Sequence, residues 1–301
     1  MELRHLRFFV AVAEEGSLTT AAQKRLHTAQ PSLSRQIREL EFEVGTALLI
    51  RSAKGVELTP AGRAFLDHAR LALAQVEAAA SAARRASQSA KASFALGFLT
   101  GQEMDWLPEA MRILRDELSS MDVTISSQYS PDLADALMRG KLDLAFMRRE
   151  AGLPDLEYRQ VVSESVVVVM PSDHRLAANK SVSAEEIASE PFIHMSATAP
   201  VFREVINDYF RKNGLTVKSE QTIDNLGMAM SLVASTRALT LLPKYAQNFL
   251  TWSVTSRPIE GGGPTIDLVI GYNKANRSAV LKTFLSRLDD LIARVAREKN
   301  S

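Results

Sequence analysis

Hydrophobic side chains recur at helical spacing through the first 45 residues of this 301-residue chain, which predicts three short helices. The first spans residues 2–15, and its apolar side consists of Leu3, Leu6, Phe9, Val10 and Ala13. Gly16 ends this helix and Ser17 caps the second one. On the second helix Ala21 and Ala22 form a narrow apolar side, so another helix can approach closely, as in a helix-turn-helix.

The third helix combines a buried stripe with a polar one. Thr28 is its expected N-cap, and Pro31 falls in the first turn, where a missing N–H costs nothing. The buried stripe, with spacings of 4, 3 and 4, consists of Leu33, Ile37, Leu40 and Val44. The polar stripe consists of Gln30, Ser34 and Arg38, flanked by Ser32 and Arg35. Such residues bind DNA, and the N-terminal part of the helix reaches the bases, which favours Gln30, Ser34 and Arg35.

A basic hairpin follows the third helix. Two short strands are expected at residues 48–51 and 56–58, joined by a turn at Lys54 and Gly55. Arg51 and Lys54 extend the positive surface toward a DNA phosphate. A helix followed by such a wing favours DNA binding over the alternative, a solvated helix face with Arg35–Glu39 and Arg38–Glu41 ion pairs.

A long helix is predicted after the wing. Apolar or small residues alternate at intervals of 4 and 3, at Gly62, Phe65, Ala69, Ala72, Val76, Ala79, Ala83, Ala86 and Ala90. This is a heptad seam, and because it is mostly alanine it supports the close approach of two helices. We expect it to join two copies of the chain, which places two DNA-binding heads on two half-sites. The alternative is an alanine-rich helix that lies on its own domain.

The remaining two-thirds of the chain alternates strand and helix patterns. After a small polar segment at residues 87–93, strands are expected at 94–98, 123–128 and 142–146 and helices at 107–118 and 131–139. A second series has strands at 166–170, 192–193 and 239–243 and helices at 184–188, 201–212 and 226–234. A strand at 266–272 and a helix at 279–297 return to the first series. This order predicts a two-lobed α/β domain with a cleft.

Ligands of open α/β sheets lie beyond the carboxyl ends of the strands, close to helix N-termini. In the first lobe these positions hold Thr100, Gly101, Ser130 and Arg148, and in the second they hold Ser196, Thr198 and Phe202. Hydroxyls, helix N–H groups and an arginine fork suit a carboxylate. The alternative is that Thr100 and Ser130 are helix caps and that Arg148 pairs with a nearby acid.

Charge is divided unevenly along the chain. Residues 1–91 hold 13 Lys and Arg against 9 Asp and Glu, a net +4, whereas the rest holds 23 against 26, a net −3. A basic head on a mildly acidic body is expected of a nucleic-acid module carried by a sensor. The chain has no cysteine, which suits a reducing cytoplasm, and it shows neither a signal peptide nor a run of roughly 20 apolar residues.

Motifs of enzymes and cofactor sites are missing from the sequence. It has no G-x-S-x-G, H-E-x-x-H, P-loop or Rossmann glycine run, and its five histidines are isolated. We therefore expect no catalytic residue, no metal and no cofactor. A free solute-binding protein would lack the basic head, and an architectural DNA protein would leave the two-lobed body without a role.

The head carries the signature of a known family. Residues 18–62, LTTAAQKRLHTAQPSLSRQIRELEFEVGTALLIRSAKGVELTPAG, resemble the LysR-type transcriptional regulators, and the resemblance extends over essentially the whole chain. It implies an N-terminal winged helix-turn-helix plus a long linker helix, and a C-terminal α/β two-lobed effector domain like a periplasmic-binding protein. It further implies DNA contacts at Thr28, Gln30, Pro31, Ser34, Arg35 and Arg51, and an inducer pocket at Thr100, Ser130, Arg148 and Phe202.

Several phrases are similar to regulators of aromatic-acid catabolism, particularly of 3-phenylpropionate/cinnamate dioxygenase, namely MELRHLRFFVAVA, LHTAQPSLSRQIRELE, VVVVMPSDHRLA, LLPKYAQNF and SRPIEGG. This resemblance implies an aromatic carboxylate as inducer, with its ring against Phe202 and Met228. The family also implies RNA polymerase as a partner, homotetramers, activation of an adjacent operon and repression of the regulator's own gene. The alternatives are a LysR-type regulator that responds to a different small anion, or a cytoplasmic α/β enzyme with a DNA-binding head.

We expect a DNA-binding domain at residues 1–58, a linker helix at 59–91 and an effector domain at 92–301. Lobe I then comprises residues 92–161 and 266–301, and lobe II comprises residues 162–265. One segment departs from the family pattern, because residues 233–238 (VASTRA) contain no glycine before the Leu-Leu-Pro strand. If this turn needs a positive φ, Thr236 or Arg237 must adopt it.

Overall fold

The computed structural model describes residues 1–52, 55–87, 92–217 and 221–298. The chain divides into two compact units, one of Met1–Ser87 with Met138–Gly140 and the other of Gln88–Leu137 with Lys141–Ser301. In the described part of the chain, every helix is too short or too polar to cross a membrane. Of the expected features, Lys54 and most of the 87–93 segment lie outside the described residues.

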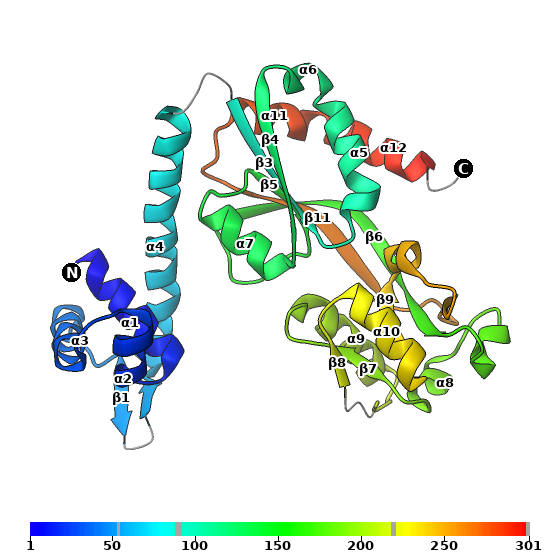
Figure 1. The fold of residues 1–301 in the computed structure, drawn as a ribbon, viewed down its shortest axis with the longest axis horizontal. Coiled ribbons are helices and arrows are strands. Elements are labelled where there is room, and N and C mark those ends of the chain that lie inside the picture. The colour runs from blue at the N-terminus through cyan, green and yellow to red at the C-terminus, as the bar shows by residue number, and fades with distance from the viewer. Residues whose placement is uncertain (53–54, 88–91, 218–220, 299–301) are drawn as a thin grey trace. The chain divides into compact units, whose positions relative to one another are not determined.

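The first unit begins with the predicted group of helices (Figure 1). Its elements are α1 (Leu3–Glu15), α2 (Leu18–Thr20) with a π turn at Ala21–Arg25, and α3 (Gln30–Val44). Gly16 ends α1 in the left-handed conformation, and Ser17 Oγ accepts a hydrogen bond from the Thr20 N–H at 3.3 Å, so both predicted end signals are confirmed. Their shared core includes fully buried Phe9, Ala21, Ala22, Leu33, Ile37 and Leu40.

The predicted N-cap of α3 is wrong by one residue. The position is occupied by Ala29, whose carbonyl accepts the N–H of Leu33 at 3.1 Å. Thr28 lies one residue before this position, and its N–H donates to the Ala22 carbonyl at 3.0 Å. Pro31 does lie in the first turn, as predicted.

The expected wing is an antiparallel hairpin of β1 (Leu49–Ser52) and β2 (Gly55–Leu58). The hairpin is held against the end of α1, because the Gly16 carbonyl accepts the Val56 N–H at 2.8 Å. Gly55 is required at this contact, since an added Cβ would lie 2.7 Å from the Gly16 carbonyl oxygen. The wing and the helices therefore form one rigid head.

The long helix α4 (Pro60–Ser87) has two different parts. Its first turns belong to the core of the head, where Ala69 is buried and the Phe65 ring meets the Phe9 ring edge-on at 5.2 Å between centroids. Farther along the predicted seam, Ala72, Ala79 and Ala83 are exposed. The start of the seam thus packs on its own domain, whereas the later part is exposed except at half-buried Val76. The side chains of the predicted seam residues Ala86 and Ala90 lie outside the described part.

The second unit is built on a mixed sheet with strand order β10-β6-β11-β5-β3-β4, and β9 pairs with β6. Strands β3 (Ala92–Leu99), β4 (Met121–Gln128) and β5 (Leu144–Met147) are parallel, which confirms the β-α-β-α-β prediction. The next strands are β6 (Leu156–Pro171) and β11 (Thr265–Asn273), and β11 runs antiparallel to β5 and β6. The late strand therefore returns to the first lobe, as expected.

Helices cover both faces of the lobe I sheet. They are α5 (Glu103–Ile113), α6 (Arg115–Leu118), α7 (Ser130–Met138), α11 (Ala279–Ser286) and α12 (Leu288–Glu298). Trp106 of α5 and Phe284 of α11 pack against Phe146 of β5. On the opposite face α7 approaches the backbone, because an added Cβ at Gly97 would lie 2.6 Å from the Leu133 side chain.

Two helices that the sequence predicts as continuous are each divided in two. The expected helices at 107–118 and 279–297 break at Leu114 and Arg287. The breaks face each other, because the Arg287 guanidinium donates to the Ile113 carbonyl at the end of α5 and pairs with Glu117 at 2.9 Å. A contact between residues 174 positions apart in the sequence thus satisfies the end of α5.

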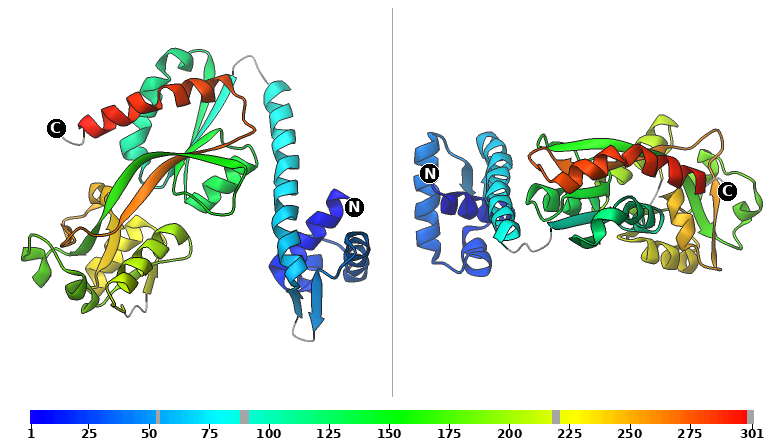
Figure 2. Two further views of the ribbon diagram at one scale, coloured as in Figure 1. Left: turned by 180° about the vertical axis from the view of Figure 1, so that it is seen from behind. Right: turned by 90° about the horizontal axis from the view of Figure 1, so that it is seen from above.

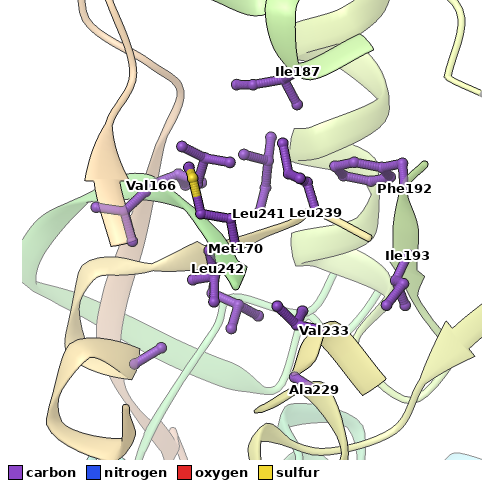
Figure 3. Close-up of a cluster of buried hydrophobic side chains, with 14 of the residues drawn as sticks. Val166, Met170, Ile187, Phe192, Ile193, Ala229, Val233, Leu239, Leu241 and Leu242 are labelled. Carbon is purple, nitrogen blue, oxygen red and sulfur yellow. The ribbon is translucent and has the colours of Figure 1, made fainter. Parts of the chain in front are cut away.

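Lobe II has a hydrophobic core of its own around the distal half of β6. Its elements are η2 (Arg175–Ala178), α8 (Ala184–Ala188), β7 (Ile193–Met195), α9 (Pro200–Lys212), β8 (Gln221–Ile223), α10 (Leu226–Thr236), β9 (Thr240–Pro243), η3 (Lys244–Phe249) and β10 (Val254–Pro258). Figure 3 shows Met170, Leu239, Leu241 and Val233 gathered between strands and helices. Strands β8 and β10 were not predicted.

Strand β6 connects the two lobes without a break, and the expected strand at 166–170 is only its final part. Residues 156–165 pair with β11 except at a bulge at Val161, and residues from Val166 onward pair with β9 and β10. Figure 2 shows β6 and β11 running side by side from one lobe into the other. The hinge of this two-lobed domain is therefore a hydrogen-bonded ribbon rather than a loop.

The glycine-free turn after α10 adopts the predicted conformation. Arg237 has a φ of +59° and is the left-handed C-cap of α10. Its guanidinium lies 3.0 Å from the Asp173 carboxylate on the surface. Arg237 therefore forms an exposed ion pair with Asp173, which holds the pKa of Asp173 below its usual value.

Candidate functional sites

The polar side of α3 is exposed mainly at Arg38 and at the residues that flank the stripe. Pro31, Ser32, Arg35 and Arg38 are exposed, while Thr28 and Gln30 are half-buried. The Arg35 side chain is 79% exposed, and its Nε lies 2.8 Å from Glu39 Oε1. Exposed pairs of this kind contribute at most about 1 kcal/mol, so the guanidinium can exchange Glu39 for a base or a phosphate.

Ser34 lies beneath this face rather than on it. Only 7% of Ser34 is exposed, and its Oγ accepts hydrogen bonds from Arg51 Nη1 at 3.0 Å and from Arg38 Nη2 at 3.4 Å. The expectation that Ser34 touches a base does not fit this burial. The hydroxyl instead positions two arginines, one from the helix and one from the wing.

Glu41 completes the connection between α3 and the wing. Its Oε1 accepts the N–H groups of Leu48 and Leu49 at 2.9 and 3.0 Å, and its Oε2 lies 3.6 Å from Arg51 Nη2. In the described structure Glu41 serves the wing in this way, and not the Arg38–Glu41 pair considered from the sequence. We call Ser34, Glu41 and Arg51 the α3–wing clasp.

A pocket lies between the lobes of the second unit, a place where small-molecule sites are commonly formed. Its polar side chains belong to the strand ends of lobe I and include Thr100, Tyr129, Ser130, Arg148 and Glu150. Its apolar side chains come mainly from lobe II and include Met195, Val201, Phe202, Leu226 and Leu242. The arrangement suits a ligand with a polar end and an apolar body.

Arg148 is anchored inside lobe I and only 4% exposed. Its backbone N–H donates to Ser130 Oγ at 2.8 Å, and its Nη2 lies 2.6 Å from Glu164 Oε2. Gln102 donates to the same Glu164 carboxylate at 2.9 Å. The predicted alternative, a nearby acid paired with Arg148, is therefore present. One nitrogen of the fork is still open, because Nη1 is buried without a hydrogen-bond partner among the described residues.

Thr100 and Gly101 face lobe II through Tyr245. The Tyr245 hydroxyl donates to the Thr100 carbonyl at 3.2 Å, and burial raises the pKa of this phenol. Gly101 has a φ of +93°, and a Cβ there would lie 2.7 Å from the Tyr245 ring. Gly101 is therefore required for packing against Tyr245, which lines the pocket, although Gly101 itself does not line it.

Tyr129 forms a second bridge between the lobes. It follows β4 in lobe I, and its hydroxyl donates to the carbonyl of Asp224, just before α10 in lobe II. Burial raises the pKa of Tyr129, and the Asp224 carboxylate adds to the effect. The phenol is therefore a neutral donor near pH 7. Both tyrosine bridges hold the lobes in their present closure.

Of the predicted pocket residues, four line the pocket, whereas Gly101, Ser196, Thr198 and Met228 do not. Thr100, Ser130, Arg148 and Phe202 line the pocket. Ser196 does not, because its Oγ caps the local turn by accepting the Thr198 N–H at 3.2 Å. Met228 is 40% exposed at the start of α10, and Leu226 takes its expected place.

Three polar lining residues, Tyr129, Glu150 and Tyr245, were missed in the sequence. Tyr129 and Glu150 adjoin the predicted Ser130 and Arg148, so their proximity to strand ends was an available signal. Tyr245 had no such signal, because it reaches Thr100 from 145 positions away. Among the described residues no group of three or more His, Asp and Glu could hold a metal.

Comparison with known proteins identifies both parts of the chain. Residues 3–63 match the family "Bacterial regulatory helix-turn-helix protein, lysR family", and residues 87–293 match "LysR substrate binding domain". The chain belongs to the LysR family. It is therefore a LysR-type transcriptional regulator with a DNA-binding head and a substrate-binding domain, and not an enzyme.

Individual relatives cover almost the full length of this LysR-type regulator. The Hca operon transcriptional activator HcaR of Escherichia coli (strain K12) is 35% identical over 299 residues, which is 98% of this chain and 99% of that protein. The regulator BenM of Acinetobacter baylyi is 30% identical over 262 residues, or 86% of each protein. The crystal structure of full-length BenM matches with a TM-score of 0.60 at 27% identity, covering 100% of this chain and 98% of that one.

Proposed function

We propose that this LysR-type regulator controls a promoter in response to an aromatic carboxylate such as 3-phenylpropionate or cinnamate. The observation that carries the proposal is the unpaired Nη1 of Arg148, which lies in a pocket whose other wall is apolar. A carboxylate would accept a charge-assisted hydrogen bond from Nη1, and an aromatic ring would replace water against Phe202 and Leu242. Similarity to an activator of the Hca operon supports the same class of signal.

We further propose that α3 enters the major groove of operator DNA. Thr28, Gln30, Pro31 and Arg35 lie at its N-terminal end, where such helices contact base edges. Arg38, Arg51 and Lys54 would bind phosphates on either side. Two heads are joined through α4 and two dimers form a tetramer, which recruits RNA polymerase at the promoter. Such a regulator works where bacterial DNA lies, in the cytoplasm.

The inducer acts by changing the closure of the lobes. A ligand between the lobes competes with or adds to the Tyr129 and Tyr245 bridges, and so favours one closure over the other. The change in closure alters the spacing of the heads in the oligomer and hence the bend of the DNA. This mechanism fails if a saturating inducer leaves both the DNase footprint and promoter output unchanged.

The inducer class is tested by thermal unfolding of the full chain with phenylpropionate, cinnamate, benzoate, muconate and amino acids. A ligand at 100 times its Kd adds about 2.7 kcal/mol of stability, which raises the Tm measurably. In Arg148→Lys the buried Glu164 keeps a cationic partner but the guanidinium fork is lost, so the shift should shrink. Arg159→Lys, which changes a lobe I arginine outside the pocket lining, is the matched control. If no aromatic acid raises the Tm, the aromatic assignment is wrong.

A further inference from the structure

Two buried polar atoms that have no hydrogen-bond partner in the described part of the chain belong to residues of the same pocket. One is Arg148 Nη1, a donor, and the other is Glu150 Oε1, an acceptor when its carboxyl is ionised. Buried polar atoms are nearly always hydrogen-bonded, so an unpaired atom in a ligand site indicates a group that the ligand supplies. The two atoms have opposite hydrogen-bonding character, and a carboxylate alone can satisfy only the first.

Glu150 is held in place by its surroundings, but among the described residues no cation pairs with its carboxyl. The Glu150 backbone carbonyl accepts the Tyr158 hydroxyl at 3.3 Å, which fixes the backbone beyond the end of β5. The neighbouring Arg149 lies over the Tyr158 ring, 5.6 Å from its centroid, and not on Glu150. Arg148 is already paired with Glu164 at 2.6 Å. Burial therefore raises the pKa of Glu150 above its usual value, without an opposing charge.

We propose that the natural inducer is an aromatic carboxylate that also carries a hydroxyl group. The hydroxyl donates a hydrogen bond to the Glu150 carboxylate, while the carboxylate of the inducer binds Arg148. This inference rests on the proposed function and specifies its ligand. The ring between the two polar groups lies against the lobe II wall of Val201, Phe202 and Leu242. A second carboxylate at Glu150 would be repelled, so the pocket excludes aromatic dicarboxylates.

The magnitude of the preference follows from the cost of an empty hydrogen-bond site. A hydrogen bond to a charged group contributes about 1.5–3 kcal/mol, and an analogue that lacks the hydroxyl leaves Glu150 Oε1 buried and unpaired. We therefore expect a hydroxylated acid to bind about 10- to 100-fold more tightly than its parent. The position of the hydroxyl on the ring decides which isomer shows the full effect.

The test is calorimetric titration of the full chain at pH 7.5 with 3-phenylpropionate and its 2-, 3- and 4-hydroxyphenyl analogues. At least one hydroxylated acid should bind 10- to 100-fold more tightly than the parent. Glu150→Gln and Glu150→Met should reduce this ratio toward one, with the affinity for the parent acid kept or increased. Glu260→Gln removes an exposed carboxylate outside the pocket lining, and the ratio should stay unchanged.

The pH dependence separates this arrangement from one in which a protonated Glu150 donates to the ligand. If ionised Glu150 accepts the hydroxyl, the ratio of parent Kd to hydroxylated Kd rises with pH through the raised pKa of Glu150. Taking the ratio cancels titration of the ligands' own carboxyl groups. A ratio that falls with pH, a ratio near one for all isomers, or a preference that survives in Glu150→Met would each overturn the inference.

The same titrations distinguish two kinds of failure. If neither the parent nor any hydroxylated acid binds, the proposed aromatic-carboxylate signal itself is wrong. If the acids bind and respond to Arg148→Lys but show no preference for a hydroxyl, only the role of Glu150 is wrong.

Discussion

Gly101 is the residue at which backbone conformation and pocket geometry depend on each other most directly. Its positive φ and its 2.7 Å approach to Tyr245 leave no room for a side chain. We predict that Gly101→Ala lowers the free energy of unfolding by about 1–3 kcal/mol more than a Gly→Ala change at a positive φ with free space around it, which adds backbone strain alone. Inducer affinity should fall as well, because Tyr245 must move.

Gly152→Ala is the matched control, because Gly152 also has a positive φ, +74°, but an added Cβ meets nothing within 4 Å. Urea unfolding of both variants measures the difference. Equal losses of stability in the two proteins would show that Tyr245 yields easily and that Gly101 is not a packing requirement.

Residue-level predictions from the sequence succeeded where strand ends decide the position. Thr100, Ser130 and Arg148 line the pocket because each follows a parallel strand, and parallel strands end at one edge of the sheet. Met228 failed because side chains two positions apart on a helix point about 200° apart, so Leu226 faces the pocket and Met228 does not. Tyr245 depends on tertiary contacts that no local pattern encodes.

Among the elements, the α3–wing clasp explains how a short hairpin keeps its orientation. Ser34 and Glu41 hold Arg51 from the helix side. We predict that Ser34→Ala weakens binding to an operator selected from a random library and lowers the slope of log K against log salt by up to about 0.9, the contribution of one phosphate contact. The physical reason is that Arg51 loses its anchor.

A double-mutant cycle tests this coupling by fluorescence anisotropy over a range of salt concentrations. Because Ser34 acts through Arg51, Ser34→Ala combined with Arg51→Ala should bind little worse than Arg51→Ala alone. Simple addition of the two losses would mean that Ser34 contacts DNA independently, as the family resemblance implied.

The later part of the α4 seam gives a prediction about assembly. Ala79 is exposed and lies beyond the part of α4 that packs on the head. We predict that Ala79→Glu weakens dimerisation, because two carboxylates would be placed in a seam built for close helix approach. Ala78→Glu is the control, since it lies about 100° farther round the helix. Analytical ultracentrifugation that finds Ala79→Glu wholly dimeric at nanomolar concentration would contradict the seam.

Element boundaries were predictable where local signals mark them. Gly16, Ser17 and Pro31 fixed helix ends in the head. The breaks at Leu114 and Arg287 have no glycine or proline, and they depend on a contact between distant segments. The first part of β6 was missed because its alternating polar residues lack the continuous apolar run of residues 166–170.

For the whole molecule, inducer and operator must influence each other equally if the proposed coupling holds. We predict that operator DNA changes the Kd of the inducer by about 5- to 150-fold, the usual range of allosteric coupling. The inducer should change the Kd of the operator by the same factor, because binding free energies form a closed cycle. Titrations of each ligand with and without the other measure both factors, and two unchanged values would rule out coupling at equilibrium.

The strand β6 also dictates an order of events during synthesis of the chain. Lobe I cannot finish its sheet until β11 has been made, because β11 lies between β5 and β6. β11 begins at Thr265 and β5 ends at Met147, so lobe I waits on the order of ten seconds on the ribosome for its missing strand. Lobe II needs residues up to Ile266, at the start of β11, to complete its core, and the head needs only residues up to α4. The DNA-binding part therefore folds first and the complete sensor last.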